Sequence, residues 1–323
     1  MTKRLLSSMC AAAMVALTMA APARAEYPDR VVHIQLGFPA GGGADILARW
    51  YADKLAKITG TNFIVENKVG ASGNLALSAA AQGKPDGYTL LFASTVTTAG
   101  NASVFKQMPL DVKKDLVPIV GFGETPFVLC VAPDSPINSV ADLTAFIKSK
   151  DGKAKYGSAT TSALASTFMY LQSVGTTATY VGYKATANAI GDVTSKEIDF
   201  AFADVVFATG QAKQGRIKII GNASNIRSPS LPDVPTLKEL TGATTGDIVA
   251  LWGVWAPAGT PPDIQAKLAK WMNDITQTEE TQKFLISQGA TPWVATPEEY
   301  KKKFEIALQA WADAVKLANI EAQ

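Results

Sequence analysis

Short apolar runs alternate along the chain with glycine-rich turns and with segments whose apolar residues recur at helical spacing. Val31–Phe38 is a β-branched and aromatic run that ends just before Gly41–Gly43. After this turn, Leu47, Tyr51 and Leu55 recur at intervals that place them on one face of a helix. An apolar strand, a glycine turn and an amphipathic helix in this order predict a βα unit.

The same alternation continues to the end of the chain and predicts an α/β protein. Further strands are predicted at Asn62–Glu66, Tyr88–Ala93, Phe127–Ala132, Lys155–Ser158, Thr179–Tyr183, Ile198–Ala203, Ile217–Gly221 and Ile248–Ala256. Helices are predicted at Leu75–Ala81, Ser139–Lys148, Leu164–Val174, Asn188–Val193, Val205–Gln214, Asp263–Ile275, Thr281–Ser287 and Glu298–Leu317. Continuous apolar strands that alternate with helices are typical of parallel sheets covered on both faces.

Two strands suggest how the chain divides into domains. Phe127–Ala132 and Trp252–Ala256 both end in Ala-Pro and flank a middle block with strands of its own. We interpret them as crossings between two α/β domains, the first made of residues 26–127 and 233–323 and the second of residues 128–232. Because ligands of open α/β sheets bind at the carboxyl ends of strands, we expect a cleft between the domains.

The N-terminus has the pattern of a secretory signal peptide over residues 1–25. Lys3 and Arg4 precede an apolar run, and small residues at Ala23 and Ala25 fit cleavage after Ala25. A membrane anchor is the alternative, but the run is shorter than the ~20 residues that a span needs. We therefore expect a secreted, soluble mature chain.

Charge and composition narrow the possible partners. Removing Lys3, Arg4 and Arg24 from 30 basic residues leaves 27 against 28 acidic residues, a net charge of −1. Without a basic patch the chain offers no electrostatic footprint for nucleic acid or an anionic membrane. We expect no nucleic-acid partner and a monomer.

Catalytic and metal-binding patterns are weak. After processing, the chain keeps one histidine, His33, and one cysteine, Cys130. Neither has partners at ligand spacing, whereas acyl-transfer triads and most zinc sites need a histidine or clustered thiolates. We therefore expect no metal, no cofactor and no enzyme activity, and we expect the tryptophans to pack in the core.

Two glycine-rich turns are the strongest candidates for ligand binding. Gly41–Gly43 and Gly70–Asn74 each precede a predicted helix, whose N-terminal N–H groups and dipole favour an anion. Glycine lets the backbone approach a ligand, although it also simply permits a tight turn. Neither turn contains Arg or Lys, so we expect Arg49 and Lys184 to matter little for binding.

Polar residues beside these turns have two interpretations each. Asp45 either caps the helix by accepting a backbone N–H or contacts the ligand. Ser94 and Thr95 either donate hydroxyls to the solute or bond to local backbone. In the middle block, the hydroxyl-rich turn Ser158–Ser162 suits a second carboxylate or a polar tail. Asp204 either caps a helix or contacts the ligand, and Tyr183 either lines the cleft or packs in the core.

Seven short motifs in order along the chain resemble the Bug-type extracytoplasmic solute receptors of tripartite tricarboxylate transporters. They are Tyr27–Arg30, Gly37–Asp45, Val65–Asn67, Gly70–Asn74, Pro85–Tyr88, Pro232–Thr236 and Ala256–Pro261. The resemblance implies a type II periplasmic binding protein fold, a Venus-flytrap closure and a carboxylate held at the first two turns. It also implies a periplasmic location and the membrane subunits of such a transporter as partners.

The resemblance leaves the ligand open, because the sequence departs from many relatives at Leu251, Ala185 and Ser158–Ser162. A di- or tricarboxylate, an aromatic acid and an amino acid all offer a carboxylate. A receptor for an ABC importer, a ligand sensor for a signalling kinase and an enzyme on the same scaffold are the alternatives. The expected ligand-binding residues are Phe38, Ala40, Gly41, Gly42, Gly43, Asp45, Ala71, Ser72, Gly73, Asn74, Ser94, Thr95, Ser158, Ala159, Thr160, Thr161, Tyr183 and Asp204.

Overall fold

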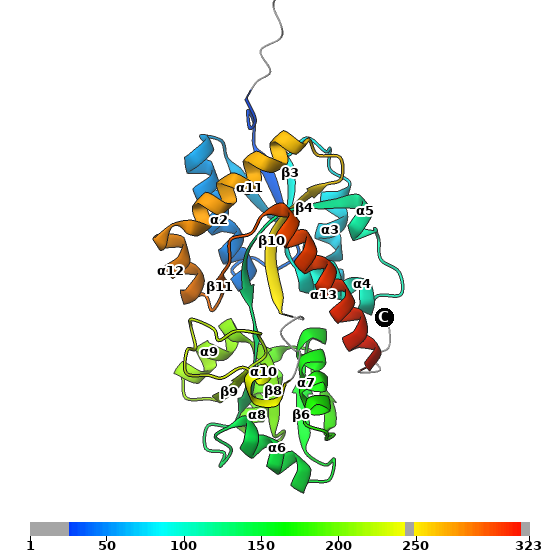
Figure 1. The fold of residues 1–323 in the computed structure, drawn as a ribbon, viewed down its shortest axis with the longest axis vertical. Coiled ribbons are helices and arrows are strands. Elements are labelled where there is room, and N and C mark those ends of the chain that lie inside the picture. Colours follow the sequence, from blue (N-terminus) through cyan, green and yellow to red (C-terminus); the bar gives the residue numbers. More distant parts are fainter. Residues whose placement is uncertain (1–25, 243–248, 318–323) are drawn as a thin grey trace, which may run out of the picture.

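The computed structural model describes residues 26–242 and 249–317. The expected signal peptide lies outside the described residues. The chain forms two α/β domains, each with a sheet between helices (Figure 1). A six-stranded sheet has the order β11-β4-β10-β3-β1-β2, and a five-stranded sheet has the order β7-β6-β8-β5-β9.

The first domain begins with the predicted βα units and ends with helices that follow the chain's return from the second domain. Its first part contains β1 (Val32–Leu36), α2 (Gly43–Thr59), β2 (Phe63–Asn67), η1 (Ala71–Gly73), α3 (Asn74–Ala81), β3 (Thr89–Ser94), η2 (Val96–Gly100), α4 (Asn101–Val104), α5 (Val112–Asp115) and β4 (Leu116–Thr125). Its second part contains β10 (Ala250–Pro257), α11 (Pro262–Gln277), α12 (Glu279–Ser287), β11 (Thr291–Pro292) and α13 (Pro297–Leu317).

The second domain repeats the strand–helix alternation. It contains β5 (Phe127–Val131), α6 (Val140–Ser149), β6 (Lys155–Ser158), α7 (Thr161–Ser173), β7 (Thr179–Gly182), α8 (Thr186–Thr194), β8 (Phe200–Asp204), α9 (Val205–Lys213), β9 (Lys218–Asn222) and α10 (Leu237–Thr241). The expected cap of α6 is present, because the hydroxyl of Ser139 accepts the N–H of Asp142 at 3.1 Å.

The sheets are mixed, so the expectation of purely parallel sheets is wrong. β1 pairs in parallel with β2 and β3, as the βα units require. β10 is antiparallel to both β3 and β4, and β5 is antiparallel to β8 and β9. The reason is the route of the chain, since β4 runs toward the second domain and β10 runs back from it. The carboxyl ends of β3, β4 and β8 consequently face the space between the domains.

β4 has no counterpart among the predicted elements. It spans Leu116–Thr125, but Pro118, Gly121 and Gly123 interrupt its apolar run. Glycine is needed at Gly121, since an added Cβ would lie 2.5 Å from the ring of Trp293. The strand continues through Pro126 into β5, and the Pro126 carbonyl accepts the N–H of Val205 at 3.1 Å.

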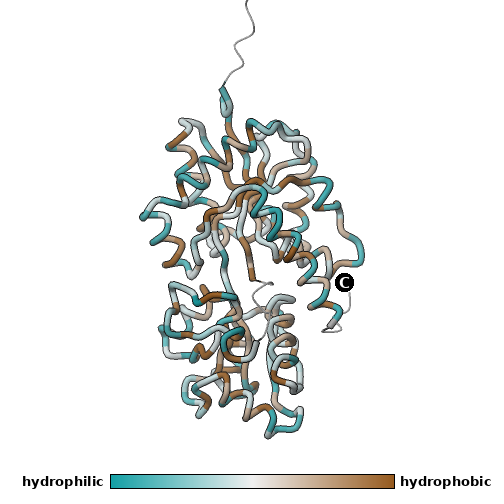
Figure 2. The backbone as a smooth tube through the Cα atoms, viewed as in Figure 1, coloured by the Kyte–Doolittle hydropathy of each residue, from teal (hydrophilic) through white to brown (hydrophobic). Residues whose placement is uncertain are grey.

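Alternating strand residues pack into cores on opposite faces of each sheet. Leu90 and Phe92 of β3 pack toward α2 and α11, whereas Leu91 and Ala93 pack toward α3 and α13. The second sheet is covered by α6 and α7 on one face and by α8 and α9 on the other. Figure 2 shows the hydrophobic residues along the strands and polar residues on the outer helices.

α10 lies with the second domain, although we expected the first domain to resume at residue 233. The hydroxyl of Thr236 accepts the N–H of Glu239, and the Glu239 carboxylate accepts the N–H of Thr236, so a capping box starts this helix. Leu237 is fully buried in the core beneath α6 and α7. The chain therefore leaves the second domain after α10. Among residues 26–242 and 249–317, no helix is both long and apolar enough to cross a membrane.

Candidate ligand-binding site

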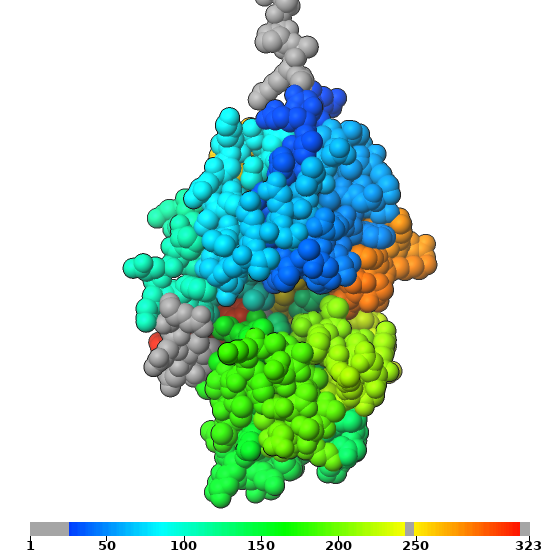
Figure 3. Space-filling model, turned by 180° about the vertical axis from the view of Figure 1, so that it is seen from behind, coloured from blue at the N-terminus to red at the C-terminus, as the bar shows by residue number. Residues whose placement is uncertain are grey.

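A cavity of about 450 Å³ lies between the two domains. Figure 3 shows the groove between the domains from behind. Residues of both domains line the cavity: Phe38, Gly43, Ala44, Leu47, Ser94, Val96, Thr125, Phe127, Thr160, Ser162, Asp204, Val206, Phe207, Ala250, Trp252 and Gln288. Five of the expected residues are among them, namely Phe38, Gly43, Ser94, Thr160 and Asp204. The cavity has the size of a small-molecule site.

The first glycine-rich turn leads from β1 into α2 and brings the start of this helix to the cavity. Gly43 and Ala44 are the first two residues of this 17-residue helix, and both line the cavity. N–H groups at the start of a helix have no carbonyl one turn earlier to bond with, and the helix dipole adds about half a positive charge there. The start of α2 can therefore bind an anion without a basic side chain.

Gly41 and Asp45 hold this turn. The Gly41 N–H donates to the Asp45 carboxylate at 2.9 Å, so this amide is occupied by the protein itself. The N-cap of α2 is Gly42, and Asp45 bonds backward to the turn instead of capping the helix. Asn67 donates to the other Asp45 oxygen at 2.8 Å. Asp45 is only 3% exposed and does not line the cavity.

Arg49 also supports the turn, although we expect it to contribute little to binding directly. Its guanidinium donates to Asp45 at 2.9 Å and to the side-chain oxygen of Asn67 at 3.0 Å. The hydrogen bond from Arg49 is the main reason that the pKa of Asp45 falls to about 2, and the bonds from Gly41 and Asn67 act in the same direction against burial. Asp45 is thus an ionised anchor.

The second turn has a left-handed backbone over successive residues. Ala71 and Ser72 have φ values of 45° and 54°, and Gly73 follows with φ of 93°. Left-handed conformation is unfavourable for Ala and Ser, and such strain persists only where the surroundings impose it. The Asn101 amide does so, because it donates to the Ser72 carbonyl at 3.0 Å and to the Asn74 side-chain oxygen at 2.8 Å. Asn101 was not predicted.

The two turns touch through glycines. A Cβ on Gly37 would lie 2.6 Å from the Cα of Gly73, so only glycine allows this approach. A Cβ on Gly73 would in turn lie 2.8 Å from Cγ2 of Thr97. The turns after β1 and β2 are therefore packed as one unit. Ala40, Gly41, Gly42, Ala71, Ser72, Gly73 and Asn74 do not line the cavity themselves.

The two polar residues after β3 differ in role. Ser94 lines the cavity. The Thr95 hydroxyl instead donates to the Val249 carbonyl at 2.9 Å and accepts the Leu251 N–H at 3.1 Å. Of the two roles considered for Thr95, bonding to the solute or to local backbone, the structure shows the bond to backbone. Thr95 thereby ties the end of β3 to the start of β10.

In the second domain, the hydroxyl-rich turn after β6 presents two residues to the cavity. Thr160 caps α7 by accepting the Ala163 N–H at 3.2 Å, and it also lines the cavity. Ser158 is occupied locally, since its hydroxyl donates to the Thr160 carbonyl at 2.7 Å. Ser162 is 1% exposed and lines the cavity, and its hydroxyl has no partner among the described residues. Ala159 and Thr161 do not line it.

Asp204 lines the cavity, whereas Tyr183 does not. Asp204 caps α9 by accepting the Phe207 N–H at 2.9 Å and also lines the cavity, and its burial raises its pKa. Tyr183 lies outside the cavity lining. Its hydroxyl donates to Asp192 at 2.6 Å, and its ring lies against Gly157, where a Cβ would be 2.8 Å away.

Aromatic side chains form much of the cavity wall, and of these only Phe38 was predicted. Trp252 lines the cavity with its indole N–H bonded to Thr125 at 2.9 Å and its ring 5.8 Å from that of Phe38. Phe127 and Phe207 belong to the wall from the second domain. Trp252 packs in the core of the first domain, as expected, and it lines the cavity as well. Its position at the domain-crossing end of β10 is the one signal that would have identified it.

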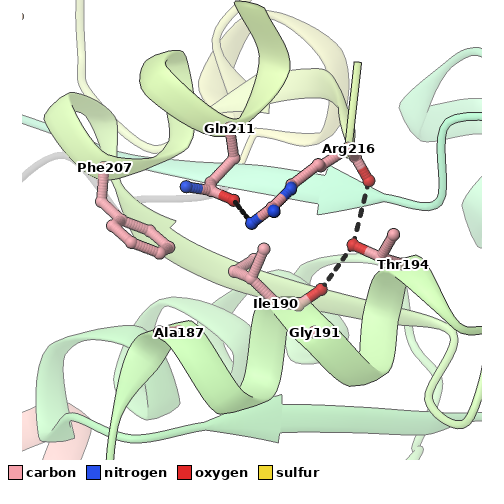
Figure 4. A pocket seen from close by; sticks show the side chains of 7 residues that line it. All are labelled: Ala187, Ile190, Gly191, Thr194, Phe207, Gln211 and Arg216. Carbon is pink, nitrogen blue, oxygen red and sulfur yellow. Dashed lines mark hydrogen bonds between the residues drawn. The ribbon is translucent and has the colours of Figure 1, made fainter. Parts of the chain in front are cut away.

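A second cavity of about 360 Å³ lies between α8 and α9 in the second domain (Figure 4). Arg216 reaches over it and donates to Gln211 at 3.3 Å, while Ile190 and Phe207 contribute apolar surface. The Thr194 hydroxyl is occupied by the carbonyls of Ile190 and Arg216. Phe207 lines both cavities. None of the described residues that line this second cavity has a buried polar atom without a partner that could orient a ligand.

The histidine and the cysteine are not placed for catalysis on a bound solute. His33 bonds to Glu66 at 2.7 Å at a half-exposed strand surface, and Cys130 is fully buried with a raised pKa caused by desolvation. In the part of the chain that the structure describes, no group of three or more His, Cys, Asp or Glu is placed to hold a metal.

Two α/β domains around a ligand-sized cavity define the class of periplasmic binding proteins. R. palustris Rpa4515, solved with adipate, matches the structure with a TM-score of 0.79 at 27% identity, over 92% of this chain and 99% of its own. MatC from Rhodopseudomonas palustris, solved with bound malate, matches with a TM-score of 0.73 at 25% identity, over 90% and 100%. The expected type II fold is confirmed by these likenesses.

Sequence comparison gives the family within this class. Residues 47–319 match the family described as tripartite tricarboxylate transporter family receptor. BugT of Bordetella pertussis is 30% identical over 306 residues, which are 92% of each chain. The chain belongs to the tripartite tricarboxylate transporter receptor family, and the resemblance carried by the seven motifs is confirmed.

Proposed function

We propose that this receptor captures a small organic carboxylate between its two domains and delivers it to the membrane subunits of a tripartite tricarboxylate transporter. The observation that carries the proposal is the N-terminus of α2 at a cavity whose lining, in the part of the chain that the structure describes, contains no Lys or Arg. The solved relatives with adipate and malate support a carboxylate ligand. The ligand leaves unchanged, so the protein is a receptor and not an enzyme.

The carboxylate binds to the amides of Gly43 and Ala44. Asp45 lies one residue further on, but its charge is neutralised by Arg49 and by the hydrogen bonds from Gly41 and Asn67. The anion therefore meets helix amides and not an exposed carboxylate. The apolar wall of Phe38, Leu47 and Val96 accepts the carbon skeleton of the acid.

Location and partners follow from the N-terminus and the family. Residues 1–25 have the pattern of a signal peptide, which fits a periplasmic receptor of this family. The mature chain acts as a monomer that opens and closes about the links between its domains. The closed form presents the surface that the membrane subunits recognise.

Substitution at Gly43 tests this placement of the anion. A Cβ on Gly43 meets nothing within 4 Å, so Gly43→Val should fold normally while its side chain enters the cavity next to the amides. Gly210→Val in α9 is the matched control, because its Cβ also meets nothing and Gly210 does not line the cavity. Acids found by thermal shift or in the co-purified protein by mass spectrometry supply the titrants for calorimetry.

The expected result is a loss of about tenfold or more in affinity for Gly43→Val, since one charge-assisted hydrogen bond contributes about 1.5 to 3 kcal/mol. Gly210→Val should bind like the wild type. A folded Gly43→Val protein with unchanged affinity places the carboxylate elsewhere. Chemical conversion of the acid during prolonged incubation contradicts the receptor function.

A further inference from the structure

The part of the cavity formed by the second domain has an unusual charge pattern. Among the described residues, Asp204 is the one charged residue that lines the cavity, and burial raises its pKa. One of its oxygens accepts the Phe207 N–H, and no Lys or Arg of the described chain forms an ion pair with it within 4 Å. A half-buried carboxylate without a cation is stabilised by any hydrogen-bond donor that reaches it.

Ser162 is the second polar group at this end of the cavity. It is 1% exposed, and its hydroxyl has no partner among the described residues. β6 and β8 are neighbouring parallel strands with Tyr156 opposite Phe200, so their carboxyl ends meet at the same edge of the sheet. α7, which contains Ser162, and α9, which follows Asp204, therefore start from neighbouring strand ends, although the two helices then cover opposite faces of the sheet. Buried hydroxyls normally have partners, and Ser162 lines the cavity, so a ligand there can supply the missing partner.

We propose that Asp204 and Ser162 together bind a hydrogen-bond donor, a hydroxyl or an ammonium group, at the end of the ligand far from its carboxylate. This inference rests on the proposed function, which places the carboxylate at α2 in the first domain. The ligand class is then a carboxylic acid with an apolar body and a distal donor. A dicarboxylate is disfavoured.

Charge decides between a donor and a second carboxylate at this end. The N-termini of α7 and α9 together contribute about one positive charge, which ionised Asp204 offsets. A second carboxylate would therefore gain no net attraction and would meet direct repulsion from the Asp204 carboxylate in a mostly apolar cavity that screens charge poorly. A hydroxyl avoids this repulsion because it donates to Asp204 and accepts from Ser162. An ammonium group adds ionic attraction to Asp204.

The test uses acids of matched length that differ only at the far end. Hexanoate, 6-hydroxyhexanoate, 6-aminohexanoate and adipate form an aliphatic set, and benzoate, 4-hydroxybenzoate and terephthalate form an aromatic one. In the wild type, the hydroxy or amino acid of the better-fitting set should bind about 10- to 100-fold more tightly than the dicarboxylate. The hydroxy and amino arms distinguish the two kinds of donor.

Asp204→Asn reverses the polarity at constant shape. Asn is also a good N-cap, so α9 should keep its start. The amide now offers a donor and no charge, so the dicarboxylate should gain about tenfold and the amino acid should lose at least as much. Ser162→Ala should weaken the hydroxy acid without improving the dicarboxylate. Asp142→Asn at the start of α6, at the far end of the domain, is the matched control and should leave the order unchanged (Figure 1).

The outcomes separate the two proposals. If no acid of either set binds the wild type, the proposed function fails, and this inference fails with it. If acids bind and Gly43→Val weakens them, but the dicarboxylate binds as tightly as the hydroxy acid and Asp204→Asn does not change the order, the distal donor is wrong while the receptor function stands. The inference is supported if Asp204→Asn reverses the order of affinity between the hydroxy or amino acid and the dicarboxylate, while the other variants do not.

Discussion

Replacing Gly73 by alanine should pull apart the two glycine-rich turns that lie behind the cavity. Gly73 has φ of 93°, and its new Cβ would lie 2.8 Å from Cγ2 of Thr97. The left-handed backbone costs alanine about 1 to 2 kcal/mol, and the overlap costs about 1 to 3 kcal/mol more. Urea unfolding should therefore show a loss of about 2 to 5 kcal/mol. Ligand affinity should fall as well, because Gly37 of the first turn packs on Gly73.

Thr97→Ser provides the partner for a double-mutant cycle. It removes the methyl group that a Cβ on Gly73 would meet, and alone it should cost about 1 kcal/mol or less. In the Gly73→Ala background, Thr97→Ser should recover the free energy of unfolding that is lost to the overlap between the two side chains. The free energy that is lost to the left-handed backbone at residue 73 should not be recovered. Strict additivity of the two changes, or a Gly73→Ala protein as stable as the wild type, would refute the packing argument.

Three further results are expected. The lowered pKa of Asp45 contributes about 2 kcal/mol of stability, which is present above about pH 4 and is lost as the pH falls toward 2. In urea titrations, the difference in unfolding free energy between the wild type and Asp45→Asn should therefore become smaller over that pH range. Ligand binding should change the tryptophan fluorescence, and Trp252→Phe should abolish this change. Trp50 is stacked on Phe284 outside the cavity, so Trp50→Phe should leave the change in place. Saturating ligand should lower the radius of gyration in small-angle scattering, and an unchanged radius argues against closure.

Much of the fold could be predicted because hydrophobic period and turn residues act locally. The first βα units and α11 to α13 lie within a few residues of their predicted positions. β4 could not be predicted, since Gly121 is required by packing against Trp293, which is distant in sequence. The direction of β10 was also hidden, because periodicity gives the faces of a strand and not its neighbours.

The candidate site was predictable where backbone chemistry alone defines it, as at Gly43 and at the Thr160 and Asp204 caps. It was not predictable where tertiary contacts decide whether a side chain contacts the ligand or bonds to the protein itself. Thr95 bonds to the backbone of β10, which lies more than 150 residues away. Ser162 and Trp252 become part of the cavity only because two domains meet there.

The hydrogen bond between Pro126 and Val205 has a consequence for selectivity. Pro126 joins β4 to β5 and so forms one link between the domains. It is hydrogen-bonded to Val205, the residue directly after Asp204, which lines the cavity. In the closure that we propose, rotation about this link carries Asp204 with the second domain. An acid with the wrong far end can still enter the open form, but it does not favour the closed one. Discrimination is then set by how long the closed form lasts, and unsuitable acids should differ from good ones in their dissociation rates more than in their association rates.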